Sequence, residues 1–147
     1  MSLLENKKAG LSYEILDTIT AGIVLSGAEV KSLRNNRGSI NEAFVVMKEN
    51  ELFLVKAFIP PYQIKNTPPS YDPYRNRKLL VTRPEIMRFV QKKSESGLTL
   101  IPLKVFSQNR NLKVLLGLAR GKSKHDKRET IKKRESDREI ARLMKNK

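Results

Sequence analysis

The alternation of apolar and polar positions predicts a chain built mainly from short β-strands. Between residues 13 and 20, the apolar side chains Tyr13, Ile15 and Ile19 recur at near-alternate positions, as on a strand with one buried face. Residues 21–25 form an apolar run interrupted only by Gly22. A glycine inside a strand predicts a bulge or a bend, which a barrel needs.

Two pairs of β-rich runs have the pattern of hairpins. The first joins residues 44–47 to 52–58 through four polar residues. The second joins residues 98–106 to 112–119 around an Asn-Arg-Asn turn. Pro102 lies within the second pair, and because proline cannot donate a ladder hydrogen bond, it predicts an edge position or a bulge. Five or six such strands predict a mainly β fold, a closed barrel of the OB type with short flanking helices.

Three Ser or Thr residues are each followed three positions later by Glu, the spacing of a capping box at a helix N-terminus. The third pair opens the clearest helix, because Ile86, Phe89 and Val90 recur at i, i+3 and i+4. Gly97 lies just past its expected end. The three pairs are Ser26 with Glu29, Ser39 with Glu42, and Thr82 with Glu85.

Positive charge dominates the composition. Thirty Lys and Arg stand against fifteen Asp and Glu, which gives a net charge of +15 and a pI near 10.2. Such a surplus predicts a polyanionic partner, most often nucleic acid and less often an anionic membrane. The alternative is a basic protein that its charge keeps soluble.

Residues 65–78, KNTPPSYDPYRNRK, combine three prolines with rings and cations. The prolines exclude a regular element, and a loop of this length inside a compact domain is usually functional or disordered. Two tyrosines lie close to Arg75, Arg77 and Lys78. Rings that stack on bases, beside cations that neutralise phosphates, suit single-stranded or looped RNA. The alternative is a solvated loop whose tyrosines cover the end of the barrel.

A boundary near Gly121 divides the chain into a body, residues 1–120, and a basic tail, residues 121–147. Residues 1–119 hold 18 cations and 10 acidic residues, whereas residues 120–147 hold 12 and 5. The tail has too few apolar residues for tertiary packing, and its arginines recur every four residues and repel one another. We therefore expect a tail that is disordered until RNA screens its charge and favours a helix. The alternative is a tail that raises affinity non-specifically.

Few residues suited to catalysis or metal binding are present. There is no Cys, His125 is the only His, and neither a P-loop nor a dinucleotide-binding glycine motif occurs. We therefore expect no enzyme, no metal site and no cofactor.

The N-terminus lacks the apolar segment of a signal peptide, and no run reaches the roughly 20 apolar residues of a membrane span. These features predict a cytoplasmic protein that does not bind membranes.

Several short motifs follow one another in a specific order. They are NKKA at 6–9, AGI at 21–23, EVKSLR at 29–34, PYRNRKLL at 73–80, GK at 121–122 and DKR at 126–128. Over nearly its whole length the chain thereby resembles the small protein B family, the tmRNA-binding proteins of bacterial trans-translation. The resemblance implies an OB-type barrel that binds the tRNA-like domain of tmRNA and delivers it to stalled ribosomes. It also implies a tail that enters the vacant decoding centre and mRNA channel and folds there as a helix.

The resemblance also implies partners and contact residues. The partners would be tmRNA, the stalled ribosome with its small-subunit rRNA, and the elongation factor Tu complex, with the chain acting as a monomer. Glu29 has an alternative role as a cap, and Leu80 as a core residue. The set facing tmRNA, with Tyr71 added from the proline-rich loop, would be Lys7, Lys8, Gly22, Glu29, Lys31, Arg34, Tyr71, Arg75, Arg77, Lys78 and Leu80. The set in the decoding centre and mRNA channel would be Gly121, Lys122, Lys124, His125, Asp126, Lys127, Arg128, Lys132, Lys133, Arg134, Arg138, Arg142, Leu143 and Met144.

The sequence departs from the family pattern at a few positions, and other functions remain open from the residues alone. The departures concern individual RNA contacts more than the function. The other candidates are a ribosomal or ribosome-assembly protein with a basic extension into rRNA, and a nuclease. The departures are Thr20 for a usual Glu, Thr82 for a frequent His or Asn, Tyr71 for a common His, and Ser136 for a frequent aromatic residue.

Overall fold

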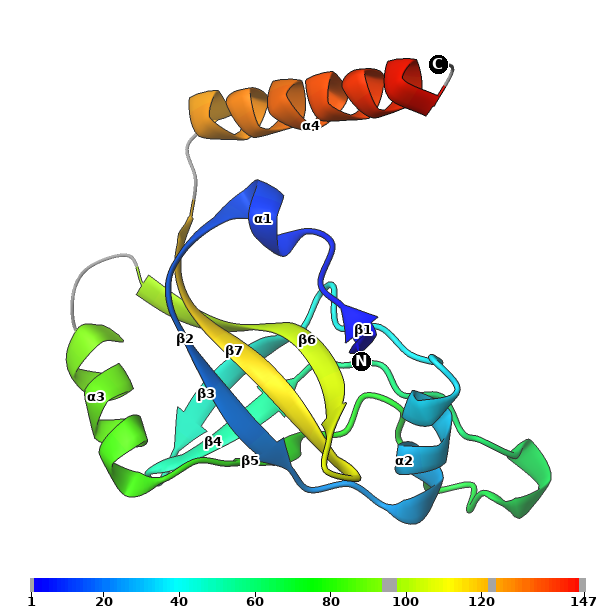
Figure 1. Cartoon of the computed structure of the whole chain (residues 1–147). Coiled ribbons are helices and arrows are strands. Elements are labelled where there is room, and N and C mark those ends of the chain that lie inside the picture. Colours follow the sequence, from blue (N-terminus) through cyan, green and yellow to red (C-terminus); the bar gives the residue numbers. More distant parts are fainter. Residues whose placement is uncertain (1, 94–97, 122–123, 146–147) are drawn as a thin grey trace.

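Seven antiparallel strands form one curled sheet in the order β1-β6-β7-β2-β5-β4-β3 (Figure 1). The structure is a computed structural model that describes residues 2–93, 98–121 and 124–145. The strands are β1 (Ser2–Glu5), β2 (Tyr13–Ile23), β3 (Phe44–Lys48), β4 (Glu51–Val55), β5 (Arg77–Leu80), β6 (Leu98–Gln108) and β7 (Asn111–Gly121). The helices are α1 (Ala9–Ser12), α2 (Gly27–Arg34), the 3-10 turn η1 (Ile64–Asn66), α3 (Arg83–Lys93) and α4 (Lys124–Lys145).

The hydrogen-bonded ladder does not close into a barrel. Strands β1 and β3 are its two ends, and β3 lies close to β6 without a ladder between them in the described part of the chain. The expected mainly β fold with short helices is therefore confirmed, whereas a closed barrel is not. The count of five or six strands was too low, because two strands were missed. Ser2–Glu5 reads SLLE and has no alternation to reveal β1. Strand β5 begins at Arg77, inside the stretch 65–78 that was expected to hold no regular element.

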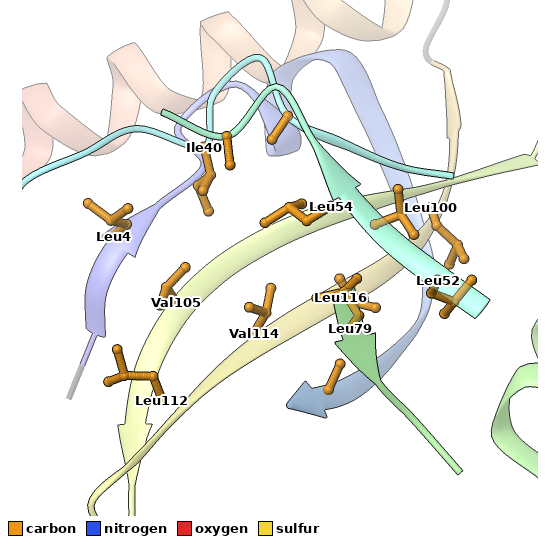
Figure 2. Close-up of a cluster of buried hydrophobic side chains, with 14 of the residues drawn as sticks. Leu4, Ile40, Leu52, Leu54, Leu79, Leu100, Val105, Leu112, Val114 and Leu116 are labelled. Carbon is orange, nitrogen blue, oxygen red and sulfur yellow. The ribbon is translucent and has the colours of Figure 1, made fainter. Parts of the chain in front are cut away.

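The core fills the inside of the curled sheet with aliphatic side chains (Figure 2). On β7, Val114, Leu116 and Leu118 alternate along one face and are at most 1% exposed. Leu52 and Leu54 of β4 face them from across the curl. Burying such side chains is the main source of stability, at about 25 cal/mol per Å² of apolar area.

Strand β2 joins the two halves of the sheet, and Gly22 lies where it changes partner. Gly22 pairs with both Lys113 of β7 and Leu80 of β5. A Cβ atom at this glycine would lie 3.2 Å from the Cβ of Leu80, so a larger residue would require Leu80 to move by a few tenths of an ångström. The register shift in β2 lies between Ile15 and Asp17, not at Gly22.

Both expected hairpins are present. Their two-residue turns hold Glu49 and Asn50, and Asn109 and Arg110, all with positive φ, as the turns that suit twisted hairpins require. A register shift follows Pro102, which confirms the bulge. The alternative edge position is wrong, because β6 lies between β1 and β7.

Two of the three expected helix starts are confirmed. Ser26 and Glu29 form a complete capping box at α2. At α3, the Thr82 N–H donates to Glu85 Oε1 at 3.2 Å. The helix expected after Ser39 is wrong, because its backbone instead forms a bridge with Phe58. Gly97, the expected end of α3, lies outside the described residues.

The tail forms a 22-residue helix, α4, which lies beside α1 (Figure 1). The sequence predicted a helix in this segment only once RNA is bound. That the helix depends on RNA in solution stays a prediction. Among the described residues, no helix is both long and apolar enough to cross a membrane.

Candidate RNA-binding surface

A buried carboxylate lies at the centre of the residues expected to face tmRNA. Glu29 stands in the first turn of α2, and its Oε1 accepts a hydrogen bond from the Ser26 N–H at 2.9 Å. Its Oε2 accepts from Arg77 Nε at 2.8 Å and from Arg75 Nε at 3.1 Å. The Tyr71 hydroxyl lies 3.3 Å from the same oxygen. The proline-rich loop is thereby tied to α2.

All three nitrogens of the Arg77 guanidinium donate hydrogen bonds to acceptors inside the protein. Besides binding Glu29, its Nη1 donates to the carbonyls of Ala57 at 2.8 Å and Arg75 at 3.1 Å. Its Nη2 donates to the carbonyl of Pro73 at 3.0 Å. No buried side-chain nitrogen or oxygen lacks a partner in the described part of the chain. This arrangement suits Arg, whose fork of donors serves several acceptors at once.

The surroundings of Glu29 favour its ionised form. Burial opposes ionisation, but hydrogen bonds from Arg75, the Ser26 N–H and Arg77 outweigh it and lower the pKa from 4.5 to about 2. Burial, together with the nearby Glu29 charge, raises the pKa of the Tyr71 hydroxyl. The cluster is therefore a fixed ion-pair network at neutral pH.

Burial corrects part of the expected contact set. The side chains of Glu29 and Arg77 have no exposed surface, so they cannot touch RNA in this conformation. Arg75 keeps 37% of its side chain exposed, although it is paired with Glu29. The capping role considered for Glu29 is confirmed, and it coexists with the ion pairs.

Exposed cations line the outer side of α2 and its C-terminal end. Lys31 Nζ lies 5.8 Å from the centre of the Tyr62 ring. Arg34 Nη2 donates to the carbonyl of Arg110 at 2.7 Å, and Arg37 Nη1 donates to that of Tyr62 at 3.3 Å. We call Lys31, Arg34, Arg37 and Tyr62 the α2 surface. The sequence interpretation omitted Arg37 and Tyr62, although the three-residue spacing of the cations was a usable signal.

The residues of β2 and β5 form a second exposed area. Leu80 is 53% exposed and covers Gly22, so the alternative of a core position for Leu80 is wrong. Val24, whose N–H donates to the Lys78 carbonyl at 2.9 Å, is 46% exposed. Lys78 Nζ pairs with Glu51 at 3.1 Å on the same part of the sheet.

Lys7 and Lys8 are not brought to the α2 surface. They lie between β1 and α1, where the Lys7 N–H donates to Asn41 Oδ1 at 3.0 Å and Lys8 pairs with Glu42. Because α1 lies beside α4, these lysines are near the root of the tail (Figure 1).

The described tail side chains are all exposed. Gly121 ends β7, and Lys122 lies outside the described residues. Lys124, His125, Asp126, Lys127 and Met144 belong to α4, but their side chains are also outside the described part. Arg134 reaches back toward α1, since a Cβ at Gly10 would lie 2.8 Å from its Nη2. The exposed members of the expected set are Arg128, Lys132, Lys133, Arg134, Arg138, Arg142 and Leu143.

Comparison with known proteins yields a match over almost the full chain. The SmpB protein family matches residues 3–146. SsrA-binding protein from Bartonella henselae is 48% identical over 97% of this chain and 90% of its own length. SsrA-binding protein from Paraburkholderia xenovorans is 46% identical over 99% of both chains.

A solved structure extends the similarity to three dimensions. It is described as "tmRNA-SmpB: a journey to the center of the bacterial ribosome", and its chain is 44% identical with a TM-score of 0.67. The alignment covers 86% of this chain and 92% of the solved one. Because the family match runs from β1 to the end of α4, body and tail together place this chain in the SmpB protein family.

Proposed function

We propose that this chain is an SsrA-binding protein of trans-translation. Its body binds the tRNA-like domain of tmRNA and delivers it to stalled ribosomes. Its tail enters the vacant decoding centre and mRNA channel, which permits rescue and peptide tagging. The role is one of binding rather than catalysis, it places the chain with ribosomes in the cytoplasm, and the curled sheet acts as an OB-type platform.

The observation that carries this proposal is the similarity of the whole chain, tail included, to proteins named SsrA-binding protein. The charge distribution supports it physically. The body and the tail each carry a surplus of cations, which suits two separate RNA contacts.

Within the body, we assign the tmRNA contact to the α2 surface and to the exposed area around Leu80. Lys31 and Arg34 offer charge to phosphates, and Tyr62 offers a ring to a base. Glu29 and Arg77 act as positioning residues, because they hold the loop that carries Arg75 against α2. Phosphate contacts of this kind set affinity and make it salt-dependent.

A salt titration of binding to the isolated tRNA-like domain of tmRNA tests the function. An ordinary tRNA and a duplex RNA serve as competitors. We expect tight binding that survives excess competitor at physiological salt. Binding that any RNA displaces equally well would move a ribosomal component to first place.

The same titration tests the α2 surface. Lys31→Gln removes one exposed cation and should reduce the slope of log K against log salt by about 0.9. Lys48→Gln, at an exposed position where β3 ends, is the matched control and should leave the slope unchanged. Equal slopes for Lys31→Gln and the unmodified chain would remove Lys31 from the contact.

A further inference from the structure

A cavity of about 620 Å³ lies at the root of the tail, by which we mean the end of β7 at Gly121, and it is apart from the α2 surface. Its walls come from the segment between β1 and α1, from the start of β2 and β3, from β6, and from Gly121 at the end of β7. Pockets for small ligands measure roughly 300–1,000 Å³, so the space suits one compact organic group.

Polar side chains in this cavity have unused hydrogen-bonding capacity. Within the described residues, the hydroxyls of Ser12, Tyr13 and Thr99 make no hydrogen bond, although all three line the cavity. Asn41 uses Oδ1 to accept from the Lys7 N–H, which leaves its amide NH₂ free to donate. The cavity thus offers both donors and acceptors to a polar, planar group.

Rings and cations complete the site. Tyr13 and Phe44 bring aromatic side chains to its walls. Lys56 Nζ lies 5.7 Å from the centre of the Phe44 ring. Lys8 lies at the cavity and is paired with Glu42, while Lys56 adds a second positive charge near that carboxylate. The rim therefore favours an anionic group.

From this juxtaposition we propose that the cavity binds a single unstacked nucleotide of an RNA chain. The base would occupy the cavity against Tyr13 and Phe44, bonded to the free hydroxyls and the Asn41 amide. Its phosphate would lie at the Lys8 and Lys56 rim. A nucleotide has a planar base with polar edges and an anionic phosphate, so it matches the rings, the hydrogen-bonding groups and the cations of this site. Other RNA-binding proteins bind unstacked bases of single strands in a similar way.

The location gives this site a role of its own. Gly121 pairs with Tyr13 in the β2–β7 ladder, and α4 begins three residues later. A nucleotide held here would set the direction in which the tail leaves the body. The inference stands independently of which RNA the α2 surface binds.

Nuclear magnetic resonance of the ¹⁵N-labelled full chain tests the proposal with AMP, GMP, CMP and UMP as separate probes. At least one mononucleotide should cause saturable shifts at Ser12, Tyr13, Thr99 and Gly121. Ribose 5-phosphate, which lacks a base, should leave these signals in place. Equal shifts with ribose 5-phosphate would show that only the cationic rim binds, and would overturn the proposal.

Hydroxyl deletions provide the second arm. Tyr13→Phe with Thr99→Val removes two hydrogen-bonding groups but keeps the shapes, and should weaken mononucleotide binding by roughly tenfold or more. The matched control, Thr18→Val with Tyr74→Phe, makes the same chemical changes outside the cavity and should bind as the unmodified chain does. Urea midpoints of both variants check the fold. If a folded cavity variant keeps full affinity, the site is not a nucleotide site.

Discussion

At the scale of single residues, one carboxylate organises the surface assigned to RNA. Glu29 neutralises the fully buried guanidinium of Arg77 and also holds the half-exposed Arg75. Removing one partner of a buried ion pair leaves the other charge without compensation in a medium of low polarity. In the proposed function, Arg77 therefore acts by ordering its loop, and we expect its substitution to lower stability more than it removes an RNA contact.

The first prediction concerns this pair. Glu29→Gln should lower the free energy of unfolding by about 3 kcal/mol, because Arg77 stays buried without a counter-charge. Urea unfolding followed by circular dichroism measures the change. Glu42→Gln, which breaks the exposed pair with Lys8, is the control and should leave the midpoint almost unmoved. Similar midpoints for both variants would contradict the role given to Glu29.

The second prediction concerns pH. The pKa of Glu29 falls from 4.5 to about 2 in the folded chain, so its ionisation stabilises the fold fully above pH 4.5. This contribution, on the order of 3 kcal/mol, is lost as the pH falls toward about 2. Urea unfolding at a series of pH values should therefore show the gap between the unmodified chain and Glu29→Gln narrowing below pH 4.5. If the difference in unfolding free energy between the two chains stayed constant with pH, the charge of Glu29 would not be the source of the stabilisation.

At the scale of elements, α3 is attached to the sheet by a buried ring, by the partly buried Ile86 and by charges. Phe89 is 2% exposed and belongs to the main core. Asp17 of β2 pairs with Lys92 at 2.8 Å and lies 3.7 Å from Arg88. Hydrogen bonds from Lys92 and the Thr18 N–H hold the pKa of Asp17 below its usual value. The partly exposed ion pairs orient the helix, while the buried ring supplies most of its attachment.

The third prediction separates these contributions. Phe89→Ala should destabilise the chain by about 3–5 kcal/mol, because it leaves a cavity between α3 and the sheet. Met87→Ala on the same helix, where the side chain is 68% exposed, should change stability very little. Thermal or urea unfolding compares the two. Equal effects would show that α3 does not depend on its buried face.

At the scale of the whole molecule, the body and the tail differ in how much of their side-chain surface is buried. The body buries its core inside the curled sheet, whereas the described side chains of α4 are exposed. Ile131, Ile140 and Leu143 on α4 are 42%, 57% and 60% exposed, so little apolar burial holds that helix to the body. The proposal of two RNA contacts, one for each part, follows from this independence.

The fourth prediction tests that division. A chain ending at Gly121 keeps the complete β7 strand, because Gly121 pairs with Tyr13. Its affinity for the tRNA-like domain of tmRNA should stay within about twofold of that of the full chain, since the α2 surface is intact. It should not support peptide tagging of stalled products, because the tail is missing. Filter binding and a tagging assay measure the two properties. Loss of binding on truncation would show that the tail takes part in the first contact as well.

Features governed by neighbours along the chain were determined by the sequence alone. The capping box of Ser26 and Glu29 and the two tight hairpins each depend on residues a few positions apart. At Pro102 the sequence left an edge position and a bulge open, and strand pairing decided for the bulge. Local spacing was also misleading once, at Ser39, where pairing with Phe58 prevents the helix that its capping pattern predicts. The cationic surplus, and with it an RNA partner, depends on composition and needs no fold.

Features that join distant segments were decided by the tertiary structure. The sequence around Arg77 predicted an RNA contact. The fold instead places Arg77 against Glu29, 48 residues away, with no exposed side-chain surface. Lys8 belongs to the same family motifs, but pairing of β1 and β2 with their neighbours brings it to the cavity at the root of the tail. Periodicity reports which face of an element is buried, and long-range strand pairing alone decides what that face meets.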